Sequence, residues 1–194
     1  MIRLDITFVF IVAWCFLVLI VMPVSAADTV IEETTIKAIY SFNFGKFTRW
    51  PKSKLSENNT SLGFCIFGKN PFDLSAIDAI EGKQVKGKTL HVELFENGLL
   101  SDDALPDCHI LFVSQSEKLR LQNILNKLRY QPILTVSDIE GFSGNGGMIT
   151  LIKTGDQIHF EINSDAVYRA GLSISSKLIE LAKTIKDADS AGNR

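Results

Sequence analysis

The sequence has no surplus of positive charge. Its 20 lysine and arginine residues are outnumbered by 22 aspartate and glutamate residues, which gives a formal net charge of -2. Nucleic-acid binding depends on a basic surface that neutralises phosphates, and this chain has no excess charge from which to build one. We therefore expect no nucleic-acid partner.

Motifs of known active sites are also missing. The histidines His91, His109 and His159 show no metal-ligand spacing such as HExxH, and no GxSxG nucleophile motif occurs. His109 follows Cys108, but neighbouring strand residues point to opposite faces, so this pair could not share a proton. The sequence therefore predicts a protein that is not an enzyme and has no cofactor and no metal site.

A long apolar run occurs at the N-terminus. Apolar residues over 6–22 are followed by Pro23 and by small residues, which is how a secretory signal peptide is built. We predict a signal peptide over residues 1–26 and one exported domain over residues 27–190. An uncleaved anchor is the alternative, because the run is long. Either way, the remaining chain lies outside the cytoplasm.

Cysteine is scarce. Cys15 falls in the predicted signal peptide, which leaves Cys65 and Cys108. An exported chain with two cysteines is expected to form one disulfide. Two buried free thiols are the alternative, because a bridge needs Cα atoms within about 7 Å. By the chain-entropy model, a bridge that closes a loop of about 43 residues would stabilise the fold by roughly 4 kcal/mol.

Hydrophobic patterning predicts a single α/β domain. A mixed central β-sheet is flanked by α-helices, with a C-terminal β-hairpin and helix. Strands are predicted in LGFCIFG, KTLHVELF, CHILFVS and ILTVSD. A helix between the last two implies a right-handed crossover and parallel strands. Leu74, Leu119 and Leu181 are predicted on inward helix faces, and Gly171 is predicted to break the last helix.

The first predicted helix is rich in aromatic residues. It runs from residue 29 to a stop at Pro51, and Tyr40 and Trp50 are the side chains that could form the wall of a ligand pocket. Packing of the aromatic residues in the core is the alternative.

The stretch GFSGNGGMI contains four glycines. A phosphate loop would lead into a helix N-terminus, but here two alternating runs follow, which predict a hairpin that turns at residues 154–156. We interpret the stretch as a mobile loop that is structural or faces a partner, with anion binding as the alternative. Phe142 and Met148 are the candidate partner-binding residues, unless both cover the domain's own core.

In consecutive order, these segments resemble the YfiR family of bacterial periplasmic proteins. The resemblance runs from about residue 34 to 184 through the segments IKAIYSFNFGKFTRWP, CIFGKNPF, CHILFVSQSE, ILTVSDIEGFSGNGGMITL, IHFEIN and AGLSISSKLIELA. It implies a non-enzymatic periplasmic regulator that binds and inhibits the periplasmic sensor region of a membrane-anchored diguanylate cyclase. Such inhibition lowers cyclic di-GMP and biofilm formation. The resemblance also implies sequestration by an outer-membrane lipoprotein and control by redox state, and a homodimer is a further candidate assembly.

The resemblance also implies roles for particular residues. It places Cys65 and Cys108 at the structural disulfide of the family. A second cysteine pair spans the glycine loop of the best-known member at the positions of Ser143 and Thr150, so this chain lacks that bridge and its loop is expected to be looser. Two other functions stay open: a periplasmic small-molecule-binding protein and an accessory protein for outer-membrane uptake.

Overall fold

The computed structural model describes residues 27–96, 105–182 and 184–186. The helices are α2 (Ala27–Phe47), α3 (Leu74–Asp78), the 3-10 helix η1 (Gln115–Arg120), α4 (Leu121–Leu128), α5 (Ser164–Arg169) and α6 (Ser176–Leu181). The strands are β1 (Thr48–Arg49), β2 (Ser61–Phe67), β3 (Gln84–Val85), β4 (Lys88–Phe95), β5 (Cys108–Val113), β6 (Leu134–Ser137), β7 (Ile149–Thr154), β8 (Gln157–Asn163), β9 (Ser173–Ile174) and β10 (Thr184–Lys186).

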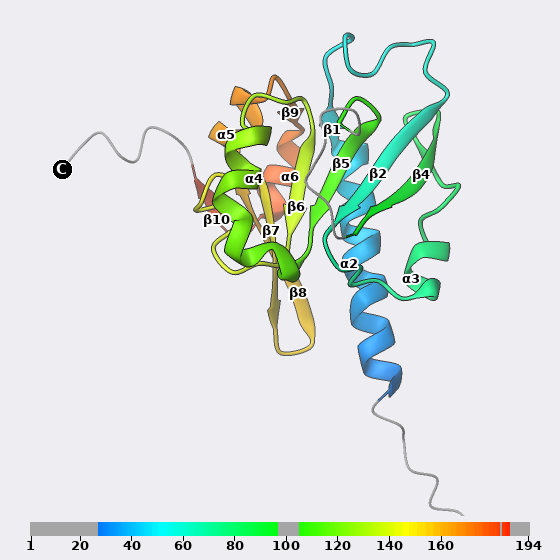
Figure 1. Cartoon of the computed structure of the whole chain (residues 1–194), viewed down its shortest axis with the longest axis vertical. Helices are drawn as coiled ribbons and strands as arrows, with labels where there is room; N and C mark the ends of the chain where they lie inside the picture. The colour runs from blue at the N-terminus through cyan, green and yellow to red at the C-terminus, as the bar shows by residue number, and fades with distance from the viewer. Residues whose placement is uncertain (1–26, 97–104, 183, 187–194) are drawn as a thin grey trace, which may run out of the picture. The chain divides into compact units, whose positions relative to one another are not determined.

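Eight strands of the described residues form one mixed sheet (Figure 1), in the order β10-β8-β7-β6-β5-β2-β4-β3. Strands β4, β2, β5, β6 and β7 are parallel. Numbered by their order in the chain, these five strands run 2-1-3-4-5 across the sheet. This is a common order of doubly wound α/β domains. Their switch point lies between β2 and β5. The predicted single domain with a mixed sheet and flanking helices is confirmed.

Two local predictions are confirmed by the strand pairing. Strands β5 and β6 are parallel neighbours, and η1 and α4 connect them. Strands β7 and β8 form the hairpin, in which Thr154 faces Gln157 across the turn. Gly155 in this turn has a φ of 59°, a conformation that glycine adopts at little cost.

The core lies on both faces of the sheet, because successive strand side chains point to opposite sides. Phe64 and Ile66 of β2 belong to a cluster that includes residues of α2, α3, α5 and α6. Cys65 and Phe67 belong to a second cluster, which packs against α4. The five described α-helices therefore cover two faces of one sheet (Figure 1), and the central strands β2, β5 and β6, taken together, are mostly apolar for this reason.

Three predicted core residues are exposed instead. Leu74, Leu119 and Leu181 are 83%, 100% and 70% exposed. Leu74 is the first residue of the short helix α3, and Ala76 faces the core in its place. Leu119 lies in the 3-10 helix, whose turn holds three residues, so the apolar face assumed for an α-helix does not apply there, and Leu121 is buried instead.

The structure differs from the predicted limits of the first and last helices. Helix α2 ends at Phe47, and β1 then pairs antiparallel with β9. The last predicted helix does break at Gly171, which has a φ of 71°. The segment after this break begins with the short strand β9, before α6. After α6, the strand β10 pairs with β8. The predicted signal peptide over residues 1–26 lies outside the described residues. None of the described helices has the length and hydropathy of a membrane span.

Candidate functional site

A disulfide joins the two strands at the switch point. Cys65 of β2 and Cys108 of β5 are bonded, and their Cα atoms are 5.7 Å apart. Both side chains are fully buried in the cluster that packs against α4. The predicted bridge is confirmed, and the alternative of two free thiols is wrong. Disulfides persist in oxidising compartments, so this bridge favours a location outside the cytoplasm.

His109 is buried beside this disulfide. Its Nδ1 atom lies 3.1 Å from the backbone nitrogen of Gly63. Nδ1 also lies 3.0 Å from the carbonyl oxygen of Asp107, and Nε2 lies 3.3 Å from the carbonyl oxygen of Lys54, so either ring nitrogen can carry the proton of a neutral imidazole. Burial and then the charge of Lys54 lower the pKa of His109. Gly63 permits this close packing, because a Cβ there would lie 2.1 Å from the carbonyl oxygen of Asp107.

A cavity of about 500 Å³ opens beside Trp50. The indole Nε1 donates a hydrogen bond to the carbonyl oxygen of His109 at 3.2 Å, which holds the ring in place. The other residues that line the cavity are Arg49, Leu55, Ser56, Glu57, Lys86, Gly87 and Lys88. One aromatic wall and three cationic side chains suit a planar anionic ligand.

Lys54 lies close to this region. Its Nζ atom donates hydrogen bonds to the carbonyl oxygens of Leu105 and Pro106, both at 2.7 Å. Burial lowers the pKa of Lys54 to about 8, and the Asp107 carboxylate only partly opposes that change. Lys54 therefore anchors the chain that leads into the disulfide strand β5.

Tyr40 and Trp50 do not share a pocket. The Tyr40 ring packs against Phe44 and Phe160, with centroid distances of 6.1 and 6.3 Å. Tyr40 is not among the residues that line the cavity beside Trp50. Of the two candidate pocket residues, Trp50 borders a cavity, whereas Tyr40 packs against the core.

The glycine stretch is packed against both faces of the sheet. Phe142 belongs to the cluster on the α4 side, and Met148 belongs to the opposite cluster. A Cβ at Gly147 would lie 2.2 Å from the Phe142 ring, so this glycine makes room for that ring. The interpretation of the stretch as a partner-facing loop does not agree with the burial of Phe142 and Met148 at 0% and 3% exposure. Both residues cover the core of the domain.

Ser143 and Thr150 are neighbours in space, as the resemblance implies. The N–H of Ser143 donates to Thr150 Oγ1 at 2.8 Å. Asn163 Nδ2 donates to the carbonyl oxygen of Ser143, and the Ser143 hydroxyl donates to Glu161 Oε2. Three hydrogen bonds therefore hold the glycine loop where a second disulfide is absent.

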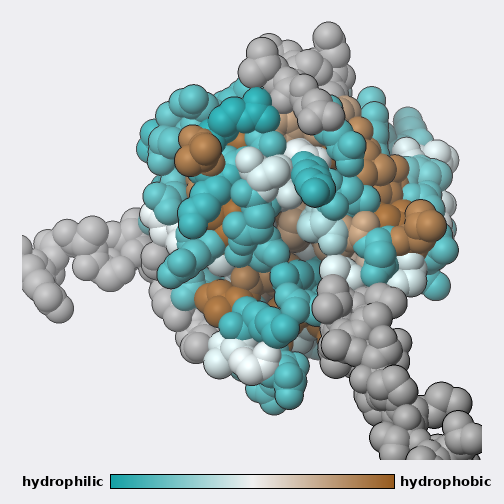
Figure 2. All heavy atoms as spheres, turned by 60° about the horizontal axis from the view of Figure 1, so that its bottom comes forward, coloured by the Kyte–Doolittle hydropathy of each residue, from teal (hydrophilic) through white to brown (hydrophobic). Residues whose placement is uncertain are grey.

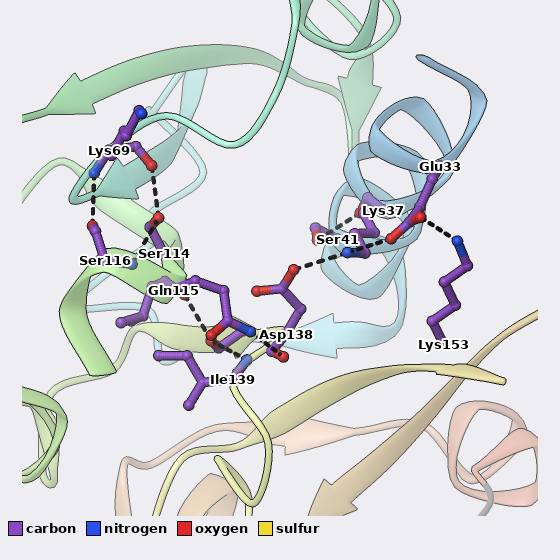
Figure 3. Close-up of polar contacts among 12 residues, drawn as sticks. Glu33, Lys37, Ser41, Lys69, Ser114, Gln115, Ser116, Asp138, Ile139 and Lys153 are labelled. Atoms are coloured by element: carbon purple, nitrogen blue, oxygen red, sulfur yellow. Dashed lines mark hydrogen bonds and ion pairs between the residues drawn. The ribbon is translucent and has the colours of Figure 1, made fainter. Parts of the chain in front are cut away.

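The crevice at the switch point is closed at the carboxyl ends of the strands. Doubly wound domains commonly bind ligands at this position. Here the Ser114 hydroxyl donates to the carbonyl oxygen of Lys69 at 2.6 Å, and the N–H of Lys69 donates to Ser116 Oγ at 2.9 Å (Figure 3). A Cβ at Gly68 would lie 2.4 Å from Ser116 Oγ. The loops after β2 and β5 thus fill this crevice themselves.

An ion cluster joins α2 to the end of β6 (Figure 3). Lys37 Nζ lies 2.9 Å from Asp138 Oδ2 and 2.8 Å from Glu33 Oε1. Burial acts to lower the pKa of Lys37, but the hydrogen bonds to Asp138 and Glu33 outweigh it and raise that pKa. Glu33 also pairs with Lys153 of β7. The cluster therefore fixes the part of α2 around Glu33 and Lys37 against two parallel strands.

Local sequence patterns indicate only part of this cluster. Glu33 and Lys37 stand four residues apart on one helix, a spacing that favours an ion pair. Asp138 directly follows a predicted strand. The contact between them depends on how α2 lies across the sheet, which local sequence does not show. Within the described part of the chain, no group of three His, Cys, Asp or Glu residues could hold a metal ion.

Hydrophobic side chains reach the surface at separate places. Figure 2 shows one face on which hydrophilic residues dominate and hydrophobic ones form separate patches. The large hydrophobic residues exposed by more than half among those described are Leu74, Leu119, Tyr130, Tyr168 and Leu181. These residues, in place of Phe142 and Met148, are accessible to a protein partner.

A family model described as YfiR/HmsC-like matches residues 34–183. The match begins in α2 and continues past α6, so it includes both disulfide cysteines, the glycine loop and the hairpin. Family membership and the disulfide both favour the periplasm. The chain therefore belongs to the YfiR/HmsC-like family, whose YfiR members regulate diguanylate cyclases.

Proposed function

We propose that this protein is a non-enzymatic periplasmic regulator that binds and inhibits the periplasmic sensor region of a membrane diguanylate cyclase. The family match over residues 34–183 carries the proposal. The resulting decrease in cyclic di-GMP would lower biofilm formation. An outer-membrane lipoprotein that sequesters this protein would relieve the inhibition.

Inhibition of this kind is a shift of population. A sensor region that exchanges between an active and an inactive conformation is driven toward the one that the regulator binds more tightly. To change the ratio from 99:1 to 1:99, the regulator must prefer the inactive state by about 10⁴-fold, which is about 5.5 kcal/mol. The regulator needs no catalytic group for this effect.

The closed switch point supports a role without catalysis. Ser114, Lys69 and Ser116 bond to one another where a doubly wound enzyme would hold its substrate. The disulfide also joins β2 to β5, through Cys108 at the amino end of β5. Both features favour a rigid domain that acts through its surface.

Photo-crosslinking in intact cells tests the proposal. A photo-reactive residue is placed at Tyr168 or at Leu119, which are exposed on different elements, and the captured proteins are identified by mass spectrometry. Capture of a membrane protein with a cyclase domain from either position supports the proposal. The control is the same residue at Phe142, which is buried and should capture nothing from a folded protein.

Small-molecule binding is a second candidate function. The cavity of about 500 Å³ beside Trp50 favours it. Native mass spectrometry of the protein purified from its own periplasm would show a retained ligand. Trp50→Phe should weaken retention, whereas Tyr40→Phe should leave it unchanged, because Tyr40 does not line this cavity.

A further inference from the structure

A second cavity, of about 300 Å³, lies between α4 and the glycine loop. One stripe of the helix forms its first wall, with residues spaced at i, i+3, i+4 and i+7. These residues are Gln122, Leu125, Asn126 and Arg129. The volume is at the lower end of the range for small-molecule sites, which is about 300 to 1,000 Å³.

The other walls come from two segments that are distant from α4 in the sequence. The backbone of residues 144–146 forms one wall, and Asn163 and Arg169 form another. Asn163 is fixed, because its side chain donates to the carbonyl oxygen of Ser143 and accepts from the N–H of Ala166. The hydrogen bonds that hold the glycine loop therefore also shape this cavity.

The cavity is cationic. Arg129 and Arg169 line it, and no carboxylate does. The Nε atom of Arg169 is buried and has no hydrogen-bond partner, although buried polar groups are almost always bonded. Neither arginine forms an ion pair with a carboxylate among the described residues, including Asp165, which lies one turn before Arg169 on α5.

We propose that this cavity binds a small molecule through an oxyanion group, either a phosphate or a carboxylate. Arginine presents a planar fork of donors that matches both groups. The amide side chains of Gln122, Asn126 and Asn145 supply further neutral donors around the same space. The two guanidinium groups would supply the positive charge for such an anion.

This mode of recognition differs from that of a phosphate loop. No helix follows the glycine stretch, because β7 begins at Ile149, so the stretch itself does not lead into a helix N-terminus. The charge comes instead from Arg129, directly after α4, and from Arg169, the last residue of α5. Gly146 has a φ of 106°, a conformation that favours glycine, and a Cβ there would meet no atom within 4 Å.

Calorimetric titration of the purified protein tests the site. The probes are inorganic phosphate, glycerol 2-phosphate and succinate, at constant ionic strength. We expect saturable binding of at least one probe at a single site. Preference for the two phosphates assigns a phosphate ligand, and preference for succinate assigns a carboxylate ligand. The absence of saturable binding by all three would overturn the proposal.

Two variants locate the binding. Arg129→Gln and Arg169→Gln should each weaken binding at least tenfold, because each removes a charge-assisted hydrogen bond. Lys177→Gln removes the same unit of charge from an exposed residue outside both cavities and should alter affinity less than twofold. Equal losses in all three variants, or none in the two cavity variants, would contradict the site.

A structural effect of these changes must be separated from an effect on binding. Arg169 is partly buried, so the thermal unfolding of Arg169→Gln is measured in parallel. Arg129 is exposed at the end of α4, and its variant should fold normally. As an independent readout, the ¹⁵N NMR signal of Arg169 Nε–H should shift during titration. A shift confined to exposed lysines and arginines would count against the proposal.

Discussion

The backbone N–H of Ser143 donates a hydrogen bond to Thr150 Oγ1 across 2.8 Å, and both residues are buried. These are the two positions at which the resemblance to YfiR places a second cysteine pair. The glycine loop of this chain is therefore closed by a polar contact at the site of that bridge. The contact does not depend on redox state, so within the described residues oxidation and reduction of cysteine should act through Cys65 and Cys108.

The double variant Ser143→Cys and Thr150→Cys should form the second disulfide. The bridge would close a loop of about seven residues, and the chain-entropy model gives about 2 kcal/mol of stabilisation. Mass spectrometry after thiol alkylation would show the bond, and chemical denaturation would give the stability. Two free thiols in the purified, air-oxidised variant would contradict the proximity of these residues.

Removal of the native disulfide should destabilise the fold strongly. Cys65 and Cys108 are separated by 43 residues, for which the same model gives about 4 kcal/mol. Replacement of both residues by alanine, followed by urea denaturation, measures the loss. Reduction of the native protein should lower the urea midpoint in the same direction. Equal midpoints with and without reductant would count against a structural role for the bridge.

The ion cluster predicts a contrast between two lysines. Lys37→Met should cost about 3 kcal/mol, because it leaves the Asp138 carboxylate buried without its partner. Lys153→Met removes the other partner of Glu33 but should cost less than about 1 kcal/mol, since Lys153 is half exposed. Thermal unfolding of both variants provides the comparison. Similar losses would show that Lys37 is not the anchor of α2.

The free energy of unfolding should decrease as the pH is lowered, because of His109. Burial and the Lys54 charge lower its pKa in the folded state below the unfolded value of 6.5. The unfolded chain therefore takes up a proton first, so stability is lost as pH falls below about 6.5 and through the folded pKa.

Two histidine variants check this assignment. Denaturation between pH 7.5 and 5 should show a smaller pH dependence for His109→Gln than for the native protein. His91→Gln is the comparison, because His91 is exposed on β4 beside Glu81 and its replacement leaves the surroundings of His109 intact. Glu33 titrates in a lower range, since hydrogen bonds from Lys153 and Lys37 lower its pKa below 4.5. An unchanged slope in His109→Gln would contradict the assignment.

The sequence predicted those parts of the fold that depend on strong local patterns. The apolar run of β5, the alternation of β7 and β8, and the count of exported cysteines each led to a confirmed feature. Short strands such as β9 and β10 were missed, because only their pairing with β1 and β8 stabilises them. Local propensity has little influence over two or three residues.

The candidate site was harder to predict, because side-chain burial depends on contacts between distant segments. Phe142 looked like an exposed loop residue, but the absence of a side chain at Gly147 lets its ring enter the core. Likewise, Arg129 and Arg169 are 40 positions apart in the sequence and line one cavity. The stripe from Gln122 to Arg129 on α4 was visible as a pattern, but nothing in it indicated the opposite wall.

Measurement of cyclic di-GMP tests the proposed inhibition most directly. Deletion of this protein should raise cyclic di-GMP, and the native chain supplied in trans should restore the original level. Deletion of the captured cyclase as well should abolish the increase, since the regulator would then have no target. An unchanged level after deletion of this protein alone, in cells that produce both proteins, would contradict the account.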